Sequence, residues 1–168
     1  EVNPGGVCLY RGCIPSKALI HQAEIYQSIP ELAAMGIKAD LSDFDYQKVY
    51  EKSRQAADRL SRGVAFLLKK NQVELVQGEA AQVKPGEVSL QDGRKLTGKA
   101  IILATGSRPR EIPGFPFDEQ DILSSTGALM LQTLPKSMLI LGSGAIGVEF
   151  AHIMNAFGVE VHLVEMLD

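Results

Sequence analysis

The spacing of apolar positions predicts two helices in the first half of the chain. Residues 14–27 read as a helix that begins near Pro15, because proline suits a first helical position whose N–H would be unpaired anyway. Over residues 46–70, apolar side chains recur at steps of three to four residues, as an amphipathic helix requires; they are Val49, Ala56, Ala57, Leu60, Val64, Leu67 and Leu68.

Shorter runs in the middle of the chain predict strands. Residues 73–83 and 87–91 alternate well enough between apolar and polar positions to be strands, and Asp92-Gly93 after them is a hairpin turn signal. The continuous apolar run at 100–104 is typical of a parallel strand that is buried on both faces.

A second unit is expected after a cluster of prolines and glycine at positions 109–116, which marks a domain boundary. Beyond it the pattern predicts a short helix at 125–131, a strand at 138–141, a helix at 145–157 and a strand at 159–164. Gly158 lies where that last helix must end. Strand, helix and strand in this order predict a right-handed βαβ unit with a parallel sheet.

Composition narrows the possible partners. The 168 residues carry a net charge of −3, which gives no electrostatic reason to expect nucleic acid or an anionic membrane. There is no apolar run long enough to span a bilayer. The sequence opens at Glu1 rather than at Met, so we expect a processed or truncated start.

The other ionisable residues show no catalytic pattern. We expect the loop acids to be solvated; they are Asp43, Asp45, Asp118, Glu119 and Asp121. We expect the helical His21 and His152 to be packed or exposed rather than catalytic.

Residues 142–147 read Gly-Ser-Gly-Ala-Ile-Gly, and their context predicts a dinucleotide site. The motif follows an apolar strand, opens a helix, and is followed by Glu165 at the end of the next strand. Gly142 would allow the tight turn, Gly144 the approach of a pyrophosphate, and Gly147 close packing of helix and strand. Glu165 would accept hydrogen bonds from a ribose diol and repel a 2′-phosphate, which favours NAD(H) over NADP(H). The alternative is a glycine-rich turn that binds nothing.

Cys8 and Cys13 are the only cysteines of the chain, and no histidine has zinc-ligand spacing relative to them, so no metal site is predicted. If they are bonded, residues 8–13 cannot form a regular helix, which would separate their Cα atoms by about 8.6 Å. Gly12 supplies the freedom for that distortion. Cys13 would then lie just before a helix N-terminus, whose positive end stabilises a thiolate. Two buried, inert cysteines or a purely structural bond remain the alternative from spacing alone.

Several motifs together resemble the pyridine nucleotide-disulfide oxidoreductases. The segment Gly5-Gly6-Val7-Cys8, followed by Gly12-Cys13-Ile14-Pro15-Ser16-Lys17-Ala18-Leu19, resembles their redox-active segment, and its ending looks most like that of the dihydrolipoyl dehydrogenases. The stretches 104–109, 125–129 and 144–149 match the family pattern in the same order. The chain departs from the pattern at Val7 and Tyr10, where the family usually has Thr and Asn, so a hydroxyl that would help hold the flavin region is missing.

The resemblance implies roles for four residues. Cys8 would be the thiol that exchanges with a lipoyl sulfur, and Cys13 the thiol against the flavin, where it forms the charge-transfer thiolate. Lys17 and Glu149 would meet near the flavin N5 and tune it; the alternative is two solvated surface charges. Ala145 stands where glutathione reductases carry an aromatic lid, which fits the dihydrolipoyl enzymes better.

The resemblance also implies a fold class and two cofactors, FAD and NAD. The fold would be α/β, with parts of two Rossmann-like doubly wound domains with parallel sheets and a small β-hairpin or meander. Residues 1–110 would be the C-terminal part of the FAD-binding domain with the redox-active disulfide, and residues 111–168 the N-terminal part of the NAD-binding domain. The cofactor-binding residues would be Gly6, Val7, Gly12, Lys17, Ala104, Thr105, Gly106, Ser107, Gly142, Gly144, Ala145, Ile146, Gly147, Glu149 and Glu165.

The expected function is that of an internal piece of such an enzyme, which passes electrons from protein-bound dihydrolipoamide to NAD+. The expected partners are the lipoyl domain of a 2-oxo acid dehydrogenase or glycine cleavage complex and, in the full-length parent, a second subunit of a homodimer. The expected location is the bacterial cytoplasm or the mitochondrial matrix. The piece alone is expected to be inactive, because the family's first glycine motif for FAD and its distant His-Glu pair would lie outside it. It is also expected to be poorly soluble, because the strands at 100–104, 138–141 and 159–164 would lack neighbouring parts of their sheets and expose apolar faces and unpaired edges. The alternatives are a mercuric or glutathione-type reductase and a non-catalytic dinucleotide-binding module.

Overall fold

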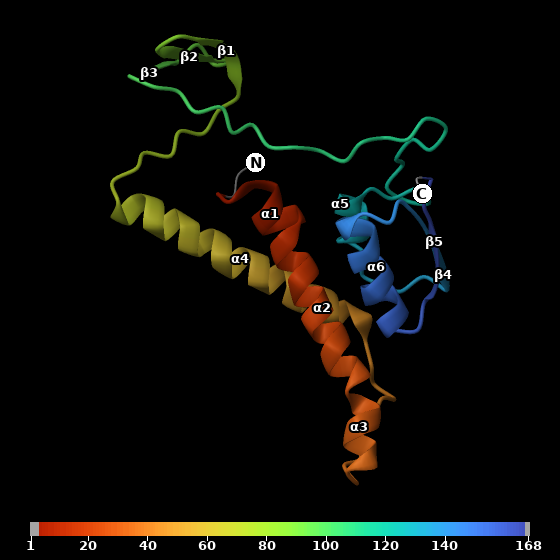
Figure 1. Ribbon diagram of the computed structural model, residues 1–168. Coiled ribbons are helices and arrows are strands. Elements are labelled where there is room, and N and C mark those ends of the chain that lie inside the picture. Colours follow the sequence, from red (N-terminus) through yellow and green to blue (C-terminus); the bar gives the residue numbers. More distant parts are fainter. Residues whose placement is uncertain (1–3, 167–168) are drawn as a thin grey trace.

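The computed structural model describes residues 4–166, which form a helical half followed by a small sheet and a βαβ unit (Figure 1). The helices of the first half are α1 (Gly6–Arg11), α2 (Cys13–Gln27), α3 (Ile29–Ala34) and α4 (Tyr46–Lys70). The first predicted helix is confirmed, although it begins at Cys13, and the second has the predicted bounds. Within the described range, no helix is long and apolar enough to cross a membrane.

Helix α4 packs through a stripe that matches the apolar spacing only in part: Val49 and Ala57 are buried as predicted, but the predicted leucines are not. Its middle is buried at Ser53, Ala57 and Ser61, whereas Leu60 and Leu67 are 44% and 53% exposed. The small side chains allow neighbouring backbones to approach closely. The buried hydroxyls cost little because the Ser53 Oγ donates to the carbonyl oxygen of Tyr50 at 2.7 Å and the Ser61 Oγ to that of Pro4 at 3.0 Å.

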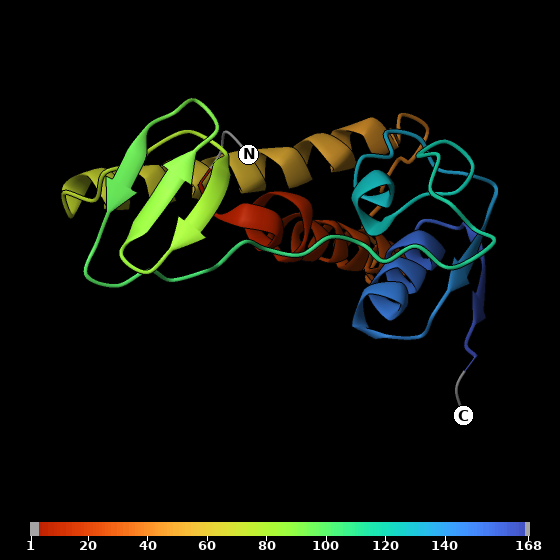
Figure 2. The ribbon, with the colours of Figure 1, turned by 90° about the horizontal axis from the view of Figure 1, so that it is seen from above.

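The middle of the chain forms a three-stranded antiparallel sheet in the order β1 (Ala80–Lys84), β2 (Glu87–Leu90) and β3 (Lys95–Thr97). The predicted strand at 73–83 is therefore wrong in its first seven residues. The predicted hairpin is confirmed: the Asp92 carboxylate accepts from the backbone N–H of Arg94 at 3.1 Å, and Gly93 takes a φ of 87°. Figure 2 shows this sheet at one end of the molecule and the βαβ unit at the other.

The predicted buried strand at 100–104 is wrong. These residues belong to no strand, and the side chains of Ile102 and Leu103 are 90% and 69% exposed. A parallel strand exists only when neighbours take up its backbone hydrogen bonds, and among residues 4–166 no strand pairs with this run. The segment instead continues as an extended connection from β3 toward the βαβ unit (Figure 1).

The last third confirms the predicted βαβ unit. Strand β4 (Ser137–Leu141) and strand β5 (Glu160–Val164) pair in parallel, with helix α6 (Ala145–Ala156) between them in the chain. Gly158 takes a φ of 86° just after α6, as expected of a glycine that ends a helix. The short helix before it, α5 (Ser125–Ala128), is three residues shorter than predicted; its N-terminus is capped by the Ser124 hydroxyl, which accepts from Thr126 and Gly127.

One apolar core joins the two halves across the predicted boundary at residues 110 and 111. Helix α2 contributes Leu19 and Ala23, and α6 contributes Ile153 and Met154, all four of them at most 1% exposed. α2 and α6 are in contact (Figure 1). This packing fixes the position of the cysteine-bearing helix relative to the helix that follows the glycine-rich turn.

Three loop acids expected to be solvated have structural roles, and one of them, Glu119, accepts from the backbone N–H of Ser124 at 3.3 Å. The Asp45 carboxylate caps α4 by accepting from the backbone N–H of Gln47 at 2.9 Å. One oxygen of Asp118 accepts three backbone N–H groups, from Gln120, Asp121 and Ile122, each at 2.8 Å. These hydrogen bonds to the charged form lower the pKa of Asp118.

Candidate functional site

Cys8 and Cys13 form a disulfide where α1 meets α2. Their Cα atoms are 4.7 Å apart, whereas a regular helix would separate them by about 8.6 Å. The helical path is broken at Gly12, which has φ −151° and ψ −117°. The prediction that a bonded pair would interrupt the helix at this glycine is confirmed.

Gly12 is needed for the close approach of the two helices. A Cβ atom at this position would lie 3.1 Å from the carbonyl oxygen of Val7 and 3.2 Å from the Cα of Cys8. Both of these are backbone atoms, which cannot rotate away as the end of a side chain can. The missing side chain therefore lets α1 fold back far enough for its cysteine to reach the next helix.

Cys13 is the first residue of the fifteen-residue helix α2, not a residue before it. The positive end of the helix dipole and its free N–H groups stabilise a thiolate at this point. The buried Ser16, which we did not single out from the sequence, donates through Oγ to the carbonyl oxygen of Cys13 at 3.2 Å. Cys8 and Cys13 are both exposed, so exposure does not separate their roles, and the assignment of the two thiols stays a prediction.

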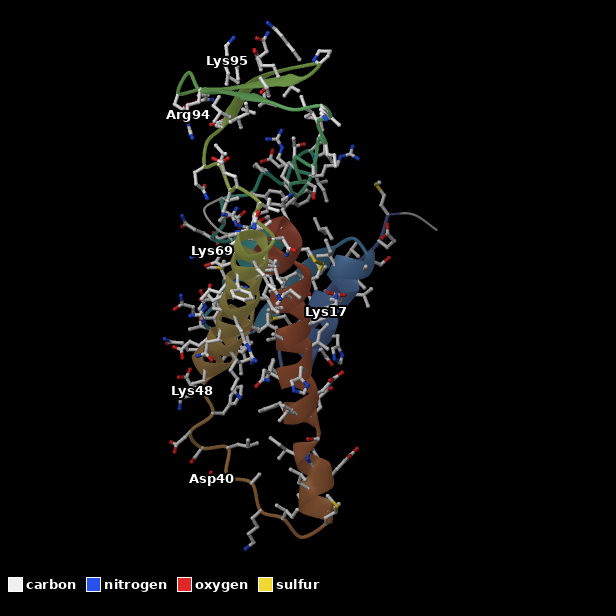
Figure 3. All side chains as sticks on the ribbon, turned by 90° about the vertical axis from the view of Figure 1, so that its left-hand side faces the viewer. Lys17, Asp40, Lys48, Lys69, Arg94 and Lys95 are labelled. Carbon is white, nitrogen blue, oxygen red and sulfur yellow. A yellow bond between two sulfur atoms is a disulfide. The ribbon has the colours of Figure 1, made fainter. Side chains whose placement is uncertain are left out.

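Lys17 lies one helical turn after Cys13, and its Nζ donates to Oε1 of Glu149 on α6. Figure 3 shows Lys17 on the side of α2 that faces α6. The prediction that these two side chains meet is confirmed. The side chains are 58% and 28% exposed, so solvent screens the pair and its direct contribution to stability is small.

The glycine-rich turn has the backbone that its motif predicts. Gly142 takes a φ of 106°, which favours glycine, and its N–H donates to the carbonyl oxygen of Val164 at 2.8 Å. A Cβ at Gly147 would overlap the carbonyl oxygen of Gly142, so the helix can start this close to the strand only with glycine there. A Cβ at Gly144 would meet nothing within 4 Å, so the space beside the N-terminus of α6 is open.

Glu165 lies beside this turn, at the end of β5. Its Oε2 accepts hydrogen bonds from the backbone N–H and the hydroxyl of Ser143, at 2.7 and 2.8 Å. Its Oε1 accepts from the backbone N–H of Met166 at 2.8 Å. The sequence predicted the place of this carboxylate but not the role of Ser143, which occupies a variable position of the motif.

Of the other candidate residues, Gly6 and Val7 lie in α1 and Ala145 and Ile146 in α6, whereas four are not built into a helix or strand. Ala104, Thr105, Gly106 and Ser107 are all exposed and belong to the extended connection after the predicted strand. Their assignment to a flavin site stays a prediction. The structure thus brings the disulfide, Lys17 and Glu149 together, and it brings Glu165 to the glycine-rich turn.

A family model and curated relatives match nearly the whole chain. The family model described as pyridine nucleotide-disulphide oxidoreductase matches residues 2–168. Dihydrolipoyl dehydrogenases of Geobacillus stearothermophilus and Chlamydia pneumoniae are 45% and 41% identical over 97% and 100% of the chain. The chain spans only 35% and 37% of the length of these two curated relatives.

Solved structures show the same fold. LpdA from Mycobacterium tuberculosis superposes with a TM-score of 0.84 at 23% identity, over 99% of this chain and 38% of that one. The HOCl-induced flavoprotein disulfide reductase RclA from Escherichia coli superposes with a TM-score of 0.78 at 25% identity, over 97% of this chain and 34% of that one. By the match of the family model over nearly its whole length, the chain belongs to the pyridine nucleotide-disulphide oxidoreductase family.

Proposed function

We propose that this chain is the thiol- and nucleotide-binding part of a dihydrolipoyl dehydrogenase. The observation that carries the proposal is the ion pair between Lys17 and Glu149. Lys17 lies one turn after the bonded Cys13, and Glu149 lies in the first turns of the helix that follows the glycine-rich turn. The ion pair thereby joins the helix that carries Cys13 to the helix that follows the glycine-rich turn, so a flavin bound between them could be reached from both sides.

The exposed disulfide can exchange with a dithiol substrate. One substrate thiolate would attack the Cys8 Sγ, which breaks the Cys8–Cys13 bond and releases Cys13 as a thiolate. The second substrate thiol would then displace Cys8 from the mixed disulfide and close the oxidised lipoyl ring. Two electrons and two protons pass from the substrate to the enzyme. The N-terminus of α2 favours the released Cys13 thiolate.

Two cofactors complete this chemistry. A bound FAD would supply two-electron redox chemistry between the thiol pair and NAD+. On the flavin side, the candidate binding residues are Gly6, Val7, Gly12, Lys17 and the 104–107 segment. On the nucleotide side, Gly142, Ala145, Ile146 and Gly147 would frame the pyrophosphate at the start of α6. The close contact at Gly147 and the open space at Gly144 both fit a pyrophosphate there.

Glu165 supports NAD+ rather than NADP+ as the acceptor. Its carboxylate is fixed at the turn by Ser143, where it would accept from the ribose diol and repel a 2′-phosphate. The partners proposed for the complete protein are a lipoyl domain of a 2-oxo acid dehydrogenase or glycine cleavage complex and a second subunit of a homodimer. The proposed compartment is the bacterial cytoplasm or the mitochondrial matrix.

The test uses the complete enzyme that contains this chain. Wild type should reduce NAD+ with dihydrolipoamide. Cys8→Ser and Cys13→Ser should each abolish this turnover and leave NADH binding intact, because the glycine-rich turn is unchanged. Turnover with NADPH and oxidised glutathione or mercuric ion, but not with dihydrolipoamide, would instead favour the other reductases of the family. NADH binding with no thiol-dependent turnover of any kind would favour a non-catalytic module.

A further inference from the structure

Helix α1, which carries Cys8, has little to hold it in place by itself. It has six residues, none of them buried, and glycine stands at both of its ends. Isolated helices shorter than about 12 residues are marginal in water. The disulfide ties α1 to α2, but that tie is absent whenever the disulfide is reduced. A thiol pair that must open and close repeatedly therefore needs a second support for α1.

Helix α4 supplies that support at both ends of α1. The Ser61 hydroxyl donates to the carbonyl oxygen of Pro4 at 3.0 Å, just before α1 begins. Two turns earlier on the same face of α4, Nη1 of Arg54 donates to the carbonyl oxygen of Tyr10 at 3.0 Å, near the end of α1. The two helices therefore run antiparallel here, and Cys8 lies between the two contact points along the chain.

The Arg54 guanidinium is enclosed where these segments meet. It lies 5.6 Å from the ring centroid of Tyr10 and 5.9 Å from that of Tyr50, and Nη1 is 3.7 Å from the sulfur of Met130. Its Nη2 is buried without a hydrogen-bond partner among the described residues. Burial lowers the pKa of Arg54, yet a guanidinium remains charged in proteins. A charged donor gives a stronger hydrogen bond than a neutral one, so the bond to Tyr10 is the firmer of the two contacts.

We propose that Arg54 and Ser61 are positioning residues that keep α1, and with it Cys8, beside Cys13 while the disulfide is open. This rests on the proposed function only in that the disulfide opens and closes. Tyr10, where the family usually has Asn, contributes to the same contact because its ring lies against the Arg54 guanidinium. Without the two contacts the reduced α1 is free to move, whereas the oxidised α1 is still tied by its bond. Removing them therefore favours the reduced state.

The test measures the Cys8–Cys13 equilibrium in the complete flavoprotein with glutathione as the probe. Two glutathione thiols reduce the disulfide to two cysteine thiols and become one glutathione disulfide, so electrons and protons balance. Protein poised at a series of glutathione ratios is alkylated, and mass spectrometry gives the fraction of the disulfide. The variants are Arg54→Met, which removes the charge and the donor, Arg54→Lys, which keeps both, and Ser61→Ala. The matched control is Arg62→Met, at an exposed arginine on the same helix.

We expect Arg54→Met to shift the equilibrium about tenfold toward the dithiol, because without this charged hydrogen bond the reduced α1 is free to move, whereas the oxidised α1 is still tied by the disulfide. This corresponds to a potential about 30 mV less negative. Arg54→Lys should restore most of the shift, Ser61→Ala should give a smaller shift of the same sign, and Arg62→Met should give none. An unchanged equilibrium in Arg54→Met, or a shift toward the disulfide, would overturn the proposal, since a residue that only stabilises the fold affects both redox states equally.

Two further measurements keep the test decisive. Should Arg54→Met fail to fold, as thermal unfolding would show, Ser61→Ala decides by the sign of its shift. Dihydrolipoamide turnover is measured separately on wild type. A wild type that exchanges with glutathione but not with dihydrolipoamide would contradict the proposed function. The positioning role would then still be decided by the glutathione equilibria of the Arg54 and Ser61 variants.

Discussion

The Nζ of Lys17 on α2 donates to Oε1 of Glu149 on α6, across 132 positions of the sequence. This contact joins the cysteine-bearing helix to the helix of the glycine-rich turn. The charges of the two side chains can therefore influence redox chemistry at the thiols, although the ion pair contributes little to the free energy of unfolding. We predict that Glu149→Gln in the complete enzyme changes the flavin absorbance spectrum and slows turnover. The free energy of unfolding should fall by less than about 1 kcal/mol, because the pair is partly exposed.

Affinity for NAD+ should be nearly unchanged in the same variant, which equilibrium titration can check. A variant that loses only stability, with the spectrum and turnover of wild type, would show that the Lys17–Glu149 pair is purely structural.

Gly12→Ala should destabilise the oxidised protein by about 1–3 kcal/mol. The new Cβ would press on the backbone of Val7 and Cys8, which overpacks the junction of α1 and α2. The matched control is Gly63→Ala in the interior of α4, where a Cβ meets nothing within 4 Å. The control should stabilise the protein by about 0.5–1 kcal/mol, because alanine favours a helix over glycine. Chemical denaturation of both variants gives the sign of each change in the free energy of unfolding. A Gly12→Ala variant that is more stable than wild type would contradict the close approach of α1 and α2.

Gly147→Ala and Gly144→Ala should separate folding from nucleotide binding. A Cβ at Gly147 overlaps the Gly142 carbonyl oxygen, so this variant should lose both thermal stability and NADH binding. A Cβ at Gly144 meets nothing in the protein, so this variant should keep its melting temperature. It should still bind NADH more weakly, because the methyl group would occupy the approach of the pyrophosphate. Unchanged NADH affinity in Gly144→Ala would contradict a pyrophosphate at this turn.

Glu165→Ala should raise the Michaelis constant for NAD+ about tenfold or more and relax the rejection of NADP+. A hydrogen bond to a charged group is worth about 1.5–3 kcal/mol, and the repulsion of a 2′-phosphate is lost as well. Ser143→Ala is the control, because it keeps the carboxylate and the backbone hydrogen bond and removes only the hydroxyl. Steady-state kinetics with both nucleotides measures the effect. An unchanged ratio of NAD+ to NADP+ activity in Glu165→Ala would show that this carboxylate does not contact the ribose.

Tyr46 should make stability fall at high pH. Burial raises the pKa of Tyr46 from its ordinary value of 10.0 to about 12, because the phenolate would be desolvated against Phe157 and its neighbours. The folded pKa lies above the unfolded one, so this contribution is complete below pH 10 and is lost as the pH rises from 10 toward 12.

The comparison of wild type with Tyr46→Phe isolates this effect, because all other titrating groups are shared. Between pH 9 and pH 11 the melting temperature of wild type should fall more steeply than that of Tyr46→Phe. Parallel pH profiles would show that the phenol is not desolvated in the folded protein.

The sequence by itself determined most of the local structure and named the residues of the candidate site. The period of the apolar residues predicted α2, α4 and the βαβ unit. Each helix satisfies its backbone hydrogen bonds internally, and the two strands of the βαβ unit pair with each other, so these elements do not depend on distant segments. The glycine-rich turn was predictable because only glycine tolerates its backbone, as Gly142 and Gly147 show. The five-residue spacing of the cysteines likewise required the break that the structure has at Gly12.

Only the tertiary structure decided which surfaces are buried and which distant side chains meet. The apolar run at 100–104 was expected to be buried, yet Ile102 is 90% exposed, because a strand depends on partners that a local pattern does not contain. On α4, two serines are buried in place of leucines, because their hydroxyls find carbonyl oxygens on α4 itself and just before α1. The contact of Arg54 with Tyr10 spans 44 positions, so no spacing rule could have found it; it follows from the packing of α4 against α1.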